Sequence, residues 1–103
     1  MAPYPIWQRD AELKIRYYNL AYGVIAEASD STSDDAPELD RRARALAQNA
    51  LATGEAKTER RHIVVGGERR LFELHELPIP QEKTLIGFAL DVTEMEVLKA
   101  DLD

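Results

Sequence analysis

Residues 84–94, TLIGFALDVTE, contain the most hydrophobic strand pattern of this 103-residue chain. The side chains alternate between two sets, Ile86, Phe88, Leu90 and Val92 on one side and Leu85, Gly87, Ala89 and Asp91 on the other. Because successive side chains of a strand point to opposite faces, this pattern predicts a strand over 84–92. Both faces are largely apolar or small, which is typical of a central strand that is covered on both sides.

The residues that follow this strand, 93–103, predict the start of a helix. Thr93 is suited to be the N-cap, and Glu96 is its reciprocal partner in a capping box. Met95, Leu98 and Leu102 are spaced three and four residues apart, as in the seam of a coiled coil. So short a seam is not stable alone, and the helix therefore either docks on the domain or begins a longer coiled coil.

A hairpin is predicted before the central strand. Gly66-Gly67 separates two strand-like runs, and a Gly-Gly pair readily adopts the positive φ of a two-residue turn. This turn sets a register in which Arg60 lies opposite Glu73 and Lys57 lies opposite Glu76. We therefore interpret Glu73 and Glu76 as members of solvated ion pairs and not as a catalytic acid/base pair.

Two short strands, residues 5–9 and 13–18, are predicted near the N-terminus. Apolar and more polar residues alternate in the second strand, which is the pattern of a half-buried strand. The side chains that we expect to face the core from this strand are Leu13, Ile15 and Tyr17.

Two helices are predicted between these strands and the hairpin. The first covers residues 20–28 and has Asn19 as its N-cap, because an Asn side-chain oxygen accepts a hydrogen bond from a free helix N–H. Its expected apolar side contains Leu20 and Val24. The second covers residues 38–53 and ends at Gly54. Between them, residues 29–36 are rich in Ser and Asp and predict a flexible, solvated loop.

Composition and charge limit the classes of partner. Thirteen Lys and Arg against nineteen Asp and Glu give a net charge of −6. An acidic domain repels phosphate backbones, so we expect no nucleic-acid partner. No apolar run approaches the roughly 20 residues that cross a bilayer, so we expect no direct membrane insertion. The chain contains no Cys, which excludes disulfides and thiolate metal sites and fits a cytoplasmic domain.

The two histidines, His62 and His75, invite a metal or haem interpretation. The hairpin register places them on one face but well apart, and no third ligand is evident. We therefore expect two ordinary strand histidines and no metal site. No P-loop, nucleophile elbow or metal-ligand cluster is present in the sequence, so we expect that this domain itself catalyses no reaction.

The order of these elements, together with two motifs, resembles a PAS domain. The motifs are IWQRD at 6–10 followed by LKIRYYNLAY at 13–22, and GFALDVTE at 87–94. The resemblance covers essentially the whole chain and implies an α+β fold, with a five-stranded antiparallel sheet, helices on one face and a C-terminal signalling helix. It divides the chain into a PAS core at 1–92 and the start of a coiled-coil signalling helix at 93–103.

The resemblance also implies a function in signal transduction. The chain resembles the PAS domains of bacterial sensor histidine kinases of two-component systems, in which the PAS domain is a non-catalytic, commonly dimeric module. Asp91, Thr93 and Glu94 then form the junction that couples the sheet to the signalling helix. The expected partner of Asp91 is a basic residue, with Arg9, Lys14 and Arg16 as the candidates. The alternative function is a ligand-free PAS scaffold for protein–protein contact and localisation.

Apolar residues fall on both faces of the predicted hairpin, although helices cover only one face. We expect the other face to meet a terminal helix or a second subunit, which makes a homodimer the expected state. The candidate residues of this outer-face interface are Trp7, Phe72 and Leu74.

The resemblance limits the cofactors as well. Haem-binding members take their axial His mainly from the long helix, and residues 38–53 contain no His. The light-sensing branch uses a Cys for its flavin chemistry, and this chain has none. We therefore expect neither haem nor a covalently bound flavin, while the identity of any small-molecule ligand stays open.

Overall fold

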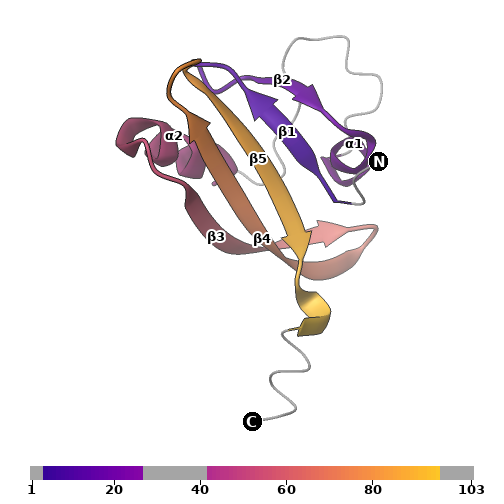
Figure 1. Ribbon diagram of the computed structural model, residues 1–103. Coiled ribbons are helices and arrows are strands. Elements are labelled where there is room, and N and C mark those ends of the chain that lie inside the picture. The colour runs from indigo at the N-terminus through magenta and orange to yellow at the C-terminus, as the bar shows by residue number, and fades with distance from the viewer. Residues whose placement is uncertain (1–3, 27–41, 96–103) are drawn as a thin grey trace.

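The computed structural model describes residues 4–26 and 42–95 of the chain. The elements follow in the order β1 (Ile6–Arg9), β2 (Ile15–Tyr18), α1 (Leu20–Ala26), α2 (Ala43–Thr53), β3 (Lys57–Val65), β4 (Glu68–Ile79) and β5 (Thr84–Asp91). The strands form one antiparallel sheet in the order β2-β1-β5-β4-β3 (Figure 1). The predicted α+β class, the five-stranded antiparallel sheet and the central position of the last strand are therefore confirmed.

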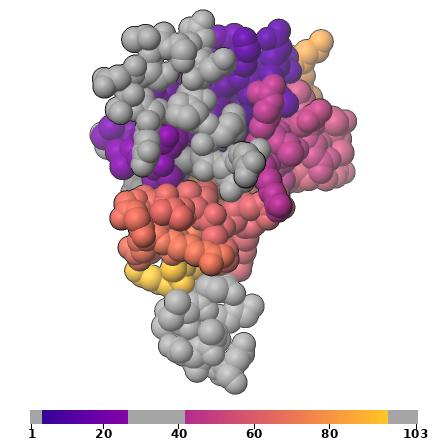
Figure 2. All heavy atoms as spheres, turned by 180° about the vertical axis from the view of Figure 1, so that it is seen from behind, coloured from indigo at the N-terminus to yellow at the C-terminus, as the bar shows by residue number. Residues whose placement is uncertain are grey.

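One face of the sheet is covered by helices α1 and α2, which lie behind the sheet in Figure 1 and in front in Figure 2. We call this the covered face, and its buried strand residues include Trp7, Ile63, Phe72, Leu74 and Ala89. The helices add Tyr22, Ala43 and Leu46 to the same core. The buried residues of α2 are Ala43, Leu46, Ala47 and Ala50.

The opposite face, which we call the outer face, is turned toward the viewer in Figure 1 and has no described helix on it. Its residues include Tyr17, Leu77 and Ile86, which are exposed. The expectation that β5 is covered on both sides therefore fails on this face within residues 4–26 and 42–95. The predicted interface residues Trp7, Phe72 and Leu74 are also wrong, because all three are buried on the covered face.

The hairpin, the start of α1 and the end of α2 follow the predictions, whereas Arg42, which was predicted to be helical, is a turn residue before α2. In the β3–β4 hairpin, Lys57 lies opposite Glu76 and Arg60 opposite Glu73, and both turn glycines have positive φ. Asn19 Oδ1 accepts hydrogen bonds from the N–H groups of Tyr22 and Ile6, each at 3.0 Å, so Asn19 caps α1 and ties it to β1. Gly54 ends α2 in the left-handed conformation.

Two predicted orientations are wrong. Leu20 and Val24 are exposed, and Tyr22 is the buried residue of α1, because its ring packs against Trp7 with 5.3 Å between centroids. Tyr17 is exposed although Ile15 is buried, because the β1–β2 register shifts between Gln8 and Arg9 and reverses the alternation of side chains.

Several predictions concern residues outside the described ranges. These are the 29–36 loop, the beginning of the helix at 38–53, and the residues Glu96, Leu98 and Leu102. Thr93, Glu94 and Met95 have helical backbone, which agrees with a helix that begins at Thr93. The capping box and the coiled-coil seam stay predictions.

Candidate functional site

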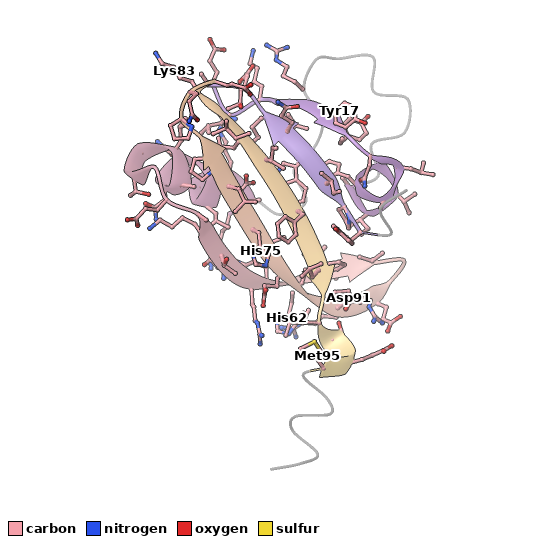
Figure 3. All side chains as sticks on the ribbon, viewed as in Figure 1. Tyr17, His62, His75, Lys83, Asp91 and Met95 are labelled. Carbon is pink, nitrogen blue, oxygen red and sulfur yellow. The ribbon has the colours of Figure 1, made fainter. Side chains whose placement is uncertain are left out.

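The first candidate site is the junction at the C-terminal end of β5. Asp91 is the last residue of β5 and lies opposite Phe72 of β4, at the end of the sheet opposite to Lys83 (Figure 3). Arg70 Nε lies 2.5 Å from Asp91 Oδ2. A second nitrogen of Arg70 lies 2.8 Å from Glu68 Oε1, so one guanidinium joins two carboxylates.

The partner of Asp91 is therefore Arg70, and the three predicted candidates are wrong. Arg9 pairs with Glu76, and Arg16 pairs with Asp10 at the β1–β2 turn. Lys14 lies in the same turn, where its N–H donates to Asp10 Oδ1. The reason is the strand order, which places the beginning of β4 beside the end of β5.

Thr93 fastens the outgoing chain to β4. Its hydroxyl accepts a hydrogen bond from the Leu71 N–H at 2.8 Å and donates to Asp91 Oδ1 at 2.6 Å. The Thr93 N–H also donates to Asp91 Oδ1, and the Val92 N–H donates to the Leu71 carbonyl. Asp91 and Thr93 thus join β4 to the start of the helix, while Glu94 is exposed.

The charges of the junction support one another. Partial burial acts to raise the pKa of Asp91, but hydrogen bonds from Arg70 and Thr93 outweigh it and hold the pKa below its ordinary value. The hydrogen bond to Asp91 raises the pKa of Arg70 in turn. At neutral pH the junction is therefore a fully ionised pair at the end of the sheet where the chain leaves β5.

The second candidate site is a polar cluster inside the core. Trp7 and Arg9 of β1 are each 1% exposed, and Glu76 of β4 is 0% exposed. Glu76 Oε1 accepts a hydrogen bond from Trp7 Nε1 at 2.8 Å and another from Arg9 Nε at 3.1 Å. Arg9 also donates to the carbonyl of Leu13 at 2.9 Å, so the cluster reaches the β1–β2 turn.

Gly87 of β5 allows this cluster to form across a strand. It lies opposite Trp7 on one side and opposite Glu76 on the other. A Cβ at position 87 would overlap the indole of Trp7. The absence of a side chain therefore lets the Trp7 indole pass over β5 and reach the Glu76 carboxylate.

The predicted solvated pair of Lys57 with Glu76 is wrong, because Glu76 is buried and Lys57 Nζ lies 3.8 Å from Glu55. Backbone register brought the two residues opposite each other, but their side chains find different partners. A usable signal was present in the sequence, since Glu76 alternates with Phe72 and Leu74 and so shares their face. The predicted pair of Arg60 with Glu73 is confirmed at 3.3 Å.

A third cluster lies on the outer face around His75 (Figure 3). The imidazole stacks on Phe88 with 4.4 Å between ring centroids. Its Nε2 lies 2.7 Å from Glu73 Oε1 and its Nδ1 lies 3.1 Å from Thr58 Oγ1. The hydrogen bond with His75 lowers the pKa of Glu73. Within residues 4–26 and 42–95, no three His, Cys, Asp or Glu side chains are grouped to hold a metal ion.

Comparison with solved structures places this arrangement in a known fold. The PAS domain of BvgS from Bordetella pertussis is 27% identical, with a TM-score of 0.59 over 98% of this chain and 81% of that chain. The chain is a PAS domain by fold. A domain of the sensory box sensor histidine kinase/response regulator from Geobacter sulfurreducens is 21% identical, with a TM-score of 0.53 over 85% of this chain and 82% of that one. No protein-family model and no curated protein matches the sequence.

A third similar structure is an RNA-binding light-oxygen-voltage receptor. It is 22% identical, with a TM-score of 0.67, and the match covers 91% of this chain. The match covers only 30% of the chain of that receptor. The fold is thus shared with light-oxygen-voltage domains as well as with domains of sensor kinases.

The shared fold is thus that of PAS domains, one of which belongs to a protein named as a sensor histidine kinase/response regulator. PAS domains are generally non-catalytic. Among the described residues, no helix is long and apolar enough to cross a membrane.

Proposed function

We propose that this PAS domain relays a signal from its sheet to the helix that begins at Thr93, as a cytoplasmic module of a bacterial sensor histidine kinase. The observation that carries the proposal is the attachment of the outgoing helix to β4. The Leu71 N–H bonds to the Thr93 hydroxyl, and Arg70 pairs with Asp91 one strand away. A displacement of β4 relative to β5 therefore acts directly on the first residue of the helix.

The energies of these contacts suit a switch. The Arg70–Asp91 pair is partly exposed, and exposed ion pairs contribute little net stability. A sensor with two conformations needs a difference of only a few kcal/mol between them, so weak contacts at the junction are sufficient to bias the equilibrium. Stronger contacts would hold the helix in one position.

The first test replaces Thr93 by Val, which keeps the shape of the side chain and removes the hydroxyl. We expect faster hydrogen exchange at the Leu71 amide, because this N–H loses its acceptor, while amides in the centre of β4 remain protected. The second test inserts the domain in place of the PAS domain of a sensor histidine kinase. We expect Thr93→Val and Arg70→Ala to change basal autophosphorylation several-fold.

Arg69→Ala is the matched control, because Arg69 precedes Arg70 on the same strand and is exposed. It should leave both the exchange rate of Leu71 and the autophosphorylation unchanged. Wild-type autophosphorylation in the folded Thr93→Val and Arg70→Ala variants would contradict the relay.

We further propose that the working form is a homodimer joined through the outer face. Leu77 lies opposite Ile86, and Gln8 lies opposite both Ile86 and Tyr17, which makes one row across four strands. None of these side chains carries a charge. Because the chain has a net charge of −6, this row without charges is the part of the outer face on which two copies approach with the least repulsion.

Sedimentation equilibrium tests the dimer. We expect Ile86→Asp to weaken association at least tenfold, because it buries a charge on each copy at the interface. Val24→Asp is the control, since Val24 is also apolar and exposed but lies on α1. Removal of residues 93–103 should also weaken association if Met95, Leu98 and Leu102 form a seam. Unchanged association in Ile86→Asp would contradict the outer-face dimer.

A second candidate function is a ligand-free scaffold for protein–protein contact. The observation that favours it is the filling of the core by the chain's own Trp7, Arg9 and Glu76 side chains. Native mass spectrometry of the domain purified from cells distinguishes the two functions. A retained small molecule supports ligand sensing, and the mass of the protein alone supports the scaffold.

A further inference from the structure

The Trp7 side chain occupies the core in the way that a bound aromatic molecule would. Its indole is 1% exposed and packs against the ring of Tyr22 at 5.3 Å between centroids. Its single polar atom, Nε1, has a dedicated acceptor in Glu76 Oε1 at 2.8 Å. The aromatic ring and the N–H of the indole, which are the two features that a receptor could recognise, are therefore contacted by Tyr22 and Glu76.

The acceptor for this ring is itself held in place. Arg9 Nε bonds to the same Glu76 oxygen at 3.1 Å, and the Arg9 guanidinium is anchored to the Leu13 carbonyl. Because both charges are buried, their geometry is fixed by these bonds and not by solvent. Arg9 thus acts as a positioning residue, which keeps a carboxylate oxygen directed at the indole N–H.

Gly87 of β5 provides the surface on which the indole lies. The indole rests where a Cβ of residue 87 would lie, so β5 presents a flat backbone surface to the ring. A flat floor, an aromatic neighbour and a fixed acceptor together define a site for a planar aromatic ring that carries an N–H donor.

We propose that Trp7 is an intramolecular ligand, and that the core site it fills is specific for indole-type rings. This inference deepens the proposed function, on which it rests, since a core filled by its own ligand receives its signal from a partner and not from a diffusible cofactor. A flavin-like molecule in the same place would have to displace the indole and separate Glu76 from its donor.

The experiment removes the side chain and supplies the ring in solution. Trp7→Ala leaves a cavity beside the Tyr22 ring, with the Glu76 carboxylate as a polar group in its wall. Core cavities with largely apolar walls bind aromatic molecules of matching size. We expect saturating indole to raise the melting temperature of Trp7→Ala by about 5 °C. Because 1-methylindole has no N–H for Glu76, it should produce less than half of this shift.

Two proteins serve as controls in the same indole titration. Wild type and Trp7→Phe should show no shift, since a side-chain ring already fills the site in both. If Trp7→Ala does not fold alone, the larger Trp7→Leu retains part of the apolar volume, and circular dichroism then follows refolding of both variants with and without indole. Failure of indole to stabilise or refold either variant overturns the proposal, as does an aromatic molecule retained by the wild-type domain.

This outcome is separable from a failure of the relay. The Trp7 variants are measured by melting temperature in the core, whereas the relay is measured at the Leu71 amide and by autophosphorylation. If indole binds Trp7→Ala while Thr93→Val leaves Leu71 exchange and autophosphorylation unchanged, the proposal of an intramolecular ligand stands and the relay is rejected.

Discussion

Two arginine–carboxylate pairs connect strands in this domain, and they differ in their exposure to water. Arg9 and Glu76 have side chains that are each 1% exposed, whereas those of Arg70 and Asp91 are 25% and 32% exposed. The first pair joins β1 to β4 across Gly87 of β5 in the middle of the sheet. The second joins adjacent strands at the point where the chain leaves the sheet. An arginine–carboxylate pair is therefore found both in the core and at the end of β5, where the chain leaves the sheet.

The difference in burial gives the two pairs different physical roles. A buried charge has lost its hydration, so each member of the Arg9–Glu76 pair depends on the other for compensation. An exposed charge that loses its partner is resolvated by water at little cost. The buried pair therefore specifies how β1 and β4 are arranged, and the exposed pair leaves the junction free to move.

The largest expected effect comes from breaking the buried pair. Glu76→Ala removes the buried carboxylate that Arg9 pairs with in the core, and we expect the free energy of unfolding to fall by about 3–5 kcal/mol. Urea denaturation measures the loss. Glu73→Ala is the matched control, because it removes a carboxylate of the same strand from an exposed pair and should cost less than about 1 kcal/mol. Equal losses in the two variants would show that burial does not separate these pairs.

The next effect concerns Gly87, the glycine that lets the Trp7 indole reach Glu76. Gly87→Ala places a methyl group against the rigid indole of Trp7, and we expect a loss of about 1–3 kcal/mol in the free energy of unfolding. Gly23→Ala is the control, since its Cβ would lie 3.4 Å from the nearest ring carbon, Cε2 of Tyr18, and Ala favours the helix. It should leave stability unchanged or raise it. A harmless Gly87→Ala would mean that the indole has room to move.

The smallest effect is expected at the exposed pair, and it depends on pH. The folded-state pKa of Asp91 lies below its unfolded value, so ionised Asp91 stabilises the fold above the ordinary Asp range. This stabilisation is lost as the pH falls through the lowered pKa. We expect wild type to exceed Asp91→Asn in stability at pH 7 and the difference to vanish toward pH 2 in thermal unfolding. A difference that persists in acid would assign the effect to hydrogen bonding and not to charge.

Predictions from the sequence succeed where neighbours along the chain decide the outcome. The turn at Gly66-Gly67 sets the register of its own hairpin, and Asn19 caps the helix that follows it directly. Predictions fail where the decisive neighbour is distant. Trp7 was expected on the outer face, and its position on the covered face depends on Gly87 and Glu76, which lie far along the chain.

The candidate site divides in the same way. Asp91 and Thr93 were recognisable because a strand must end and a helix must begin between them. The partner of Asp91 was not, since Arg70 becomes its neighbour only when β4 pairs with β5. The exposure of Tyr17 depends on a shift of register between two strands, which alternation within one strand does not reveal.

The sequence by itself determined the strands, the hairpin register, the helix ends and the resemblance to PAS domains, because these follow from side-chain periodicity, turn glycines and local capping. Only the tertiary structure decided which charges are buried and which remain in water. That choice depends on the strand order β2-β1-β5-β4-β3, which brings Glu76 to the Trp7 indole and Arg70 to Asp91 at the exposed end of β5. Because of this difference in burial, the Arg9–Glu76 pair holds the core in one arrangement, whereas the chemically similar Arg70–Asp91 pair lets the junction move.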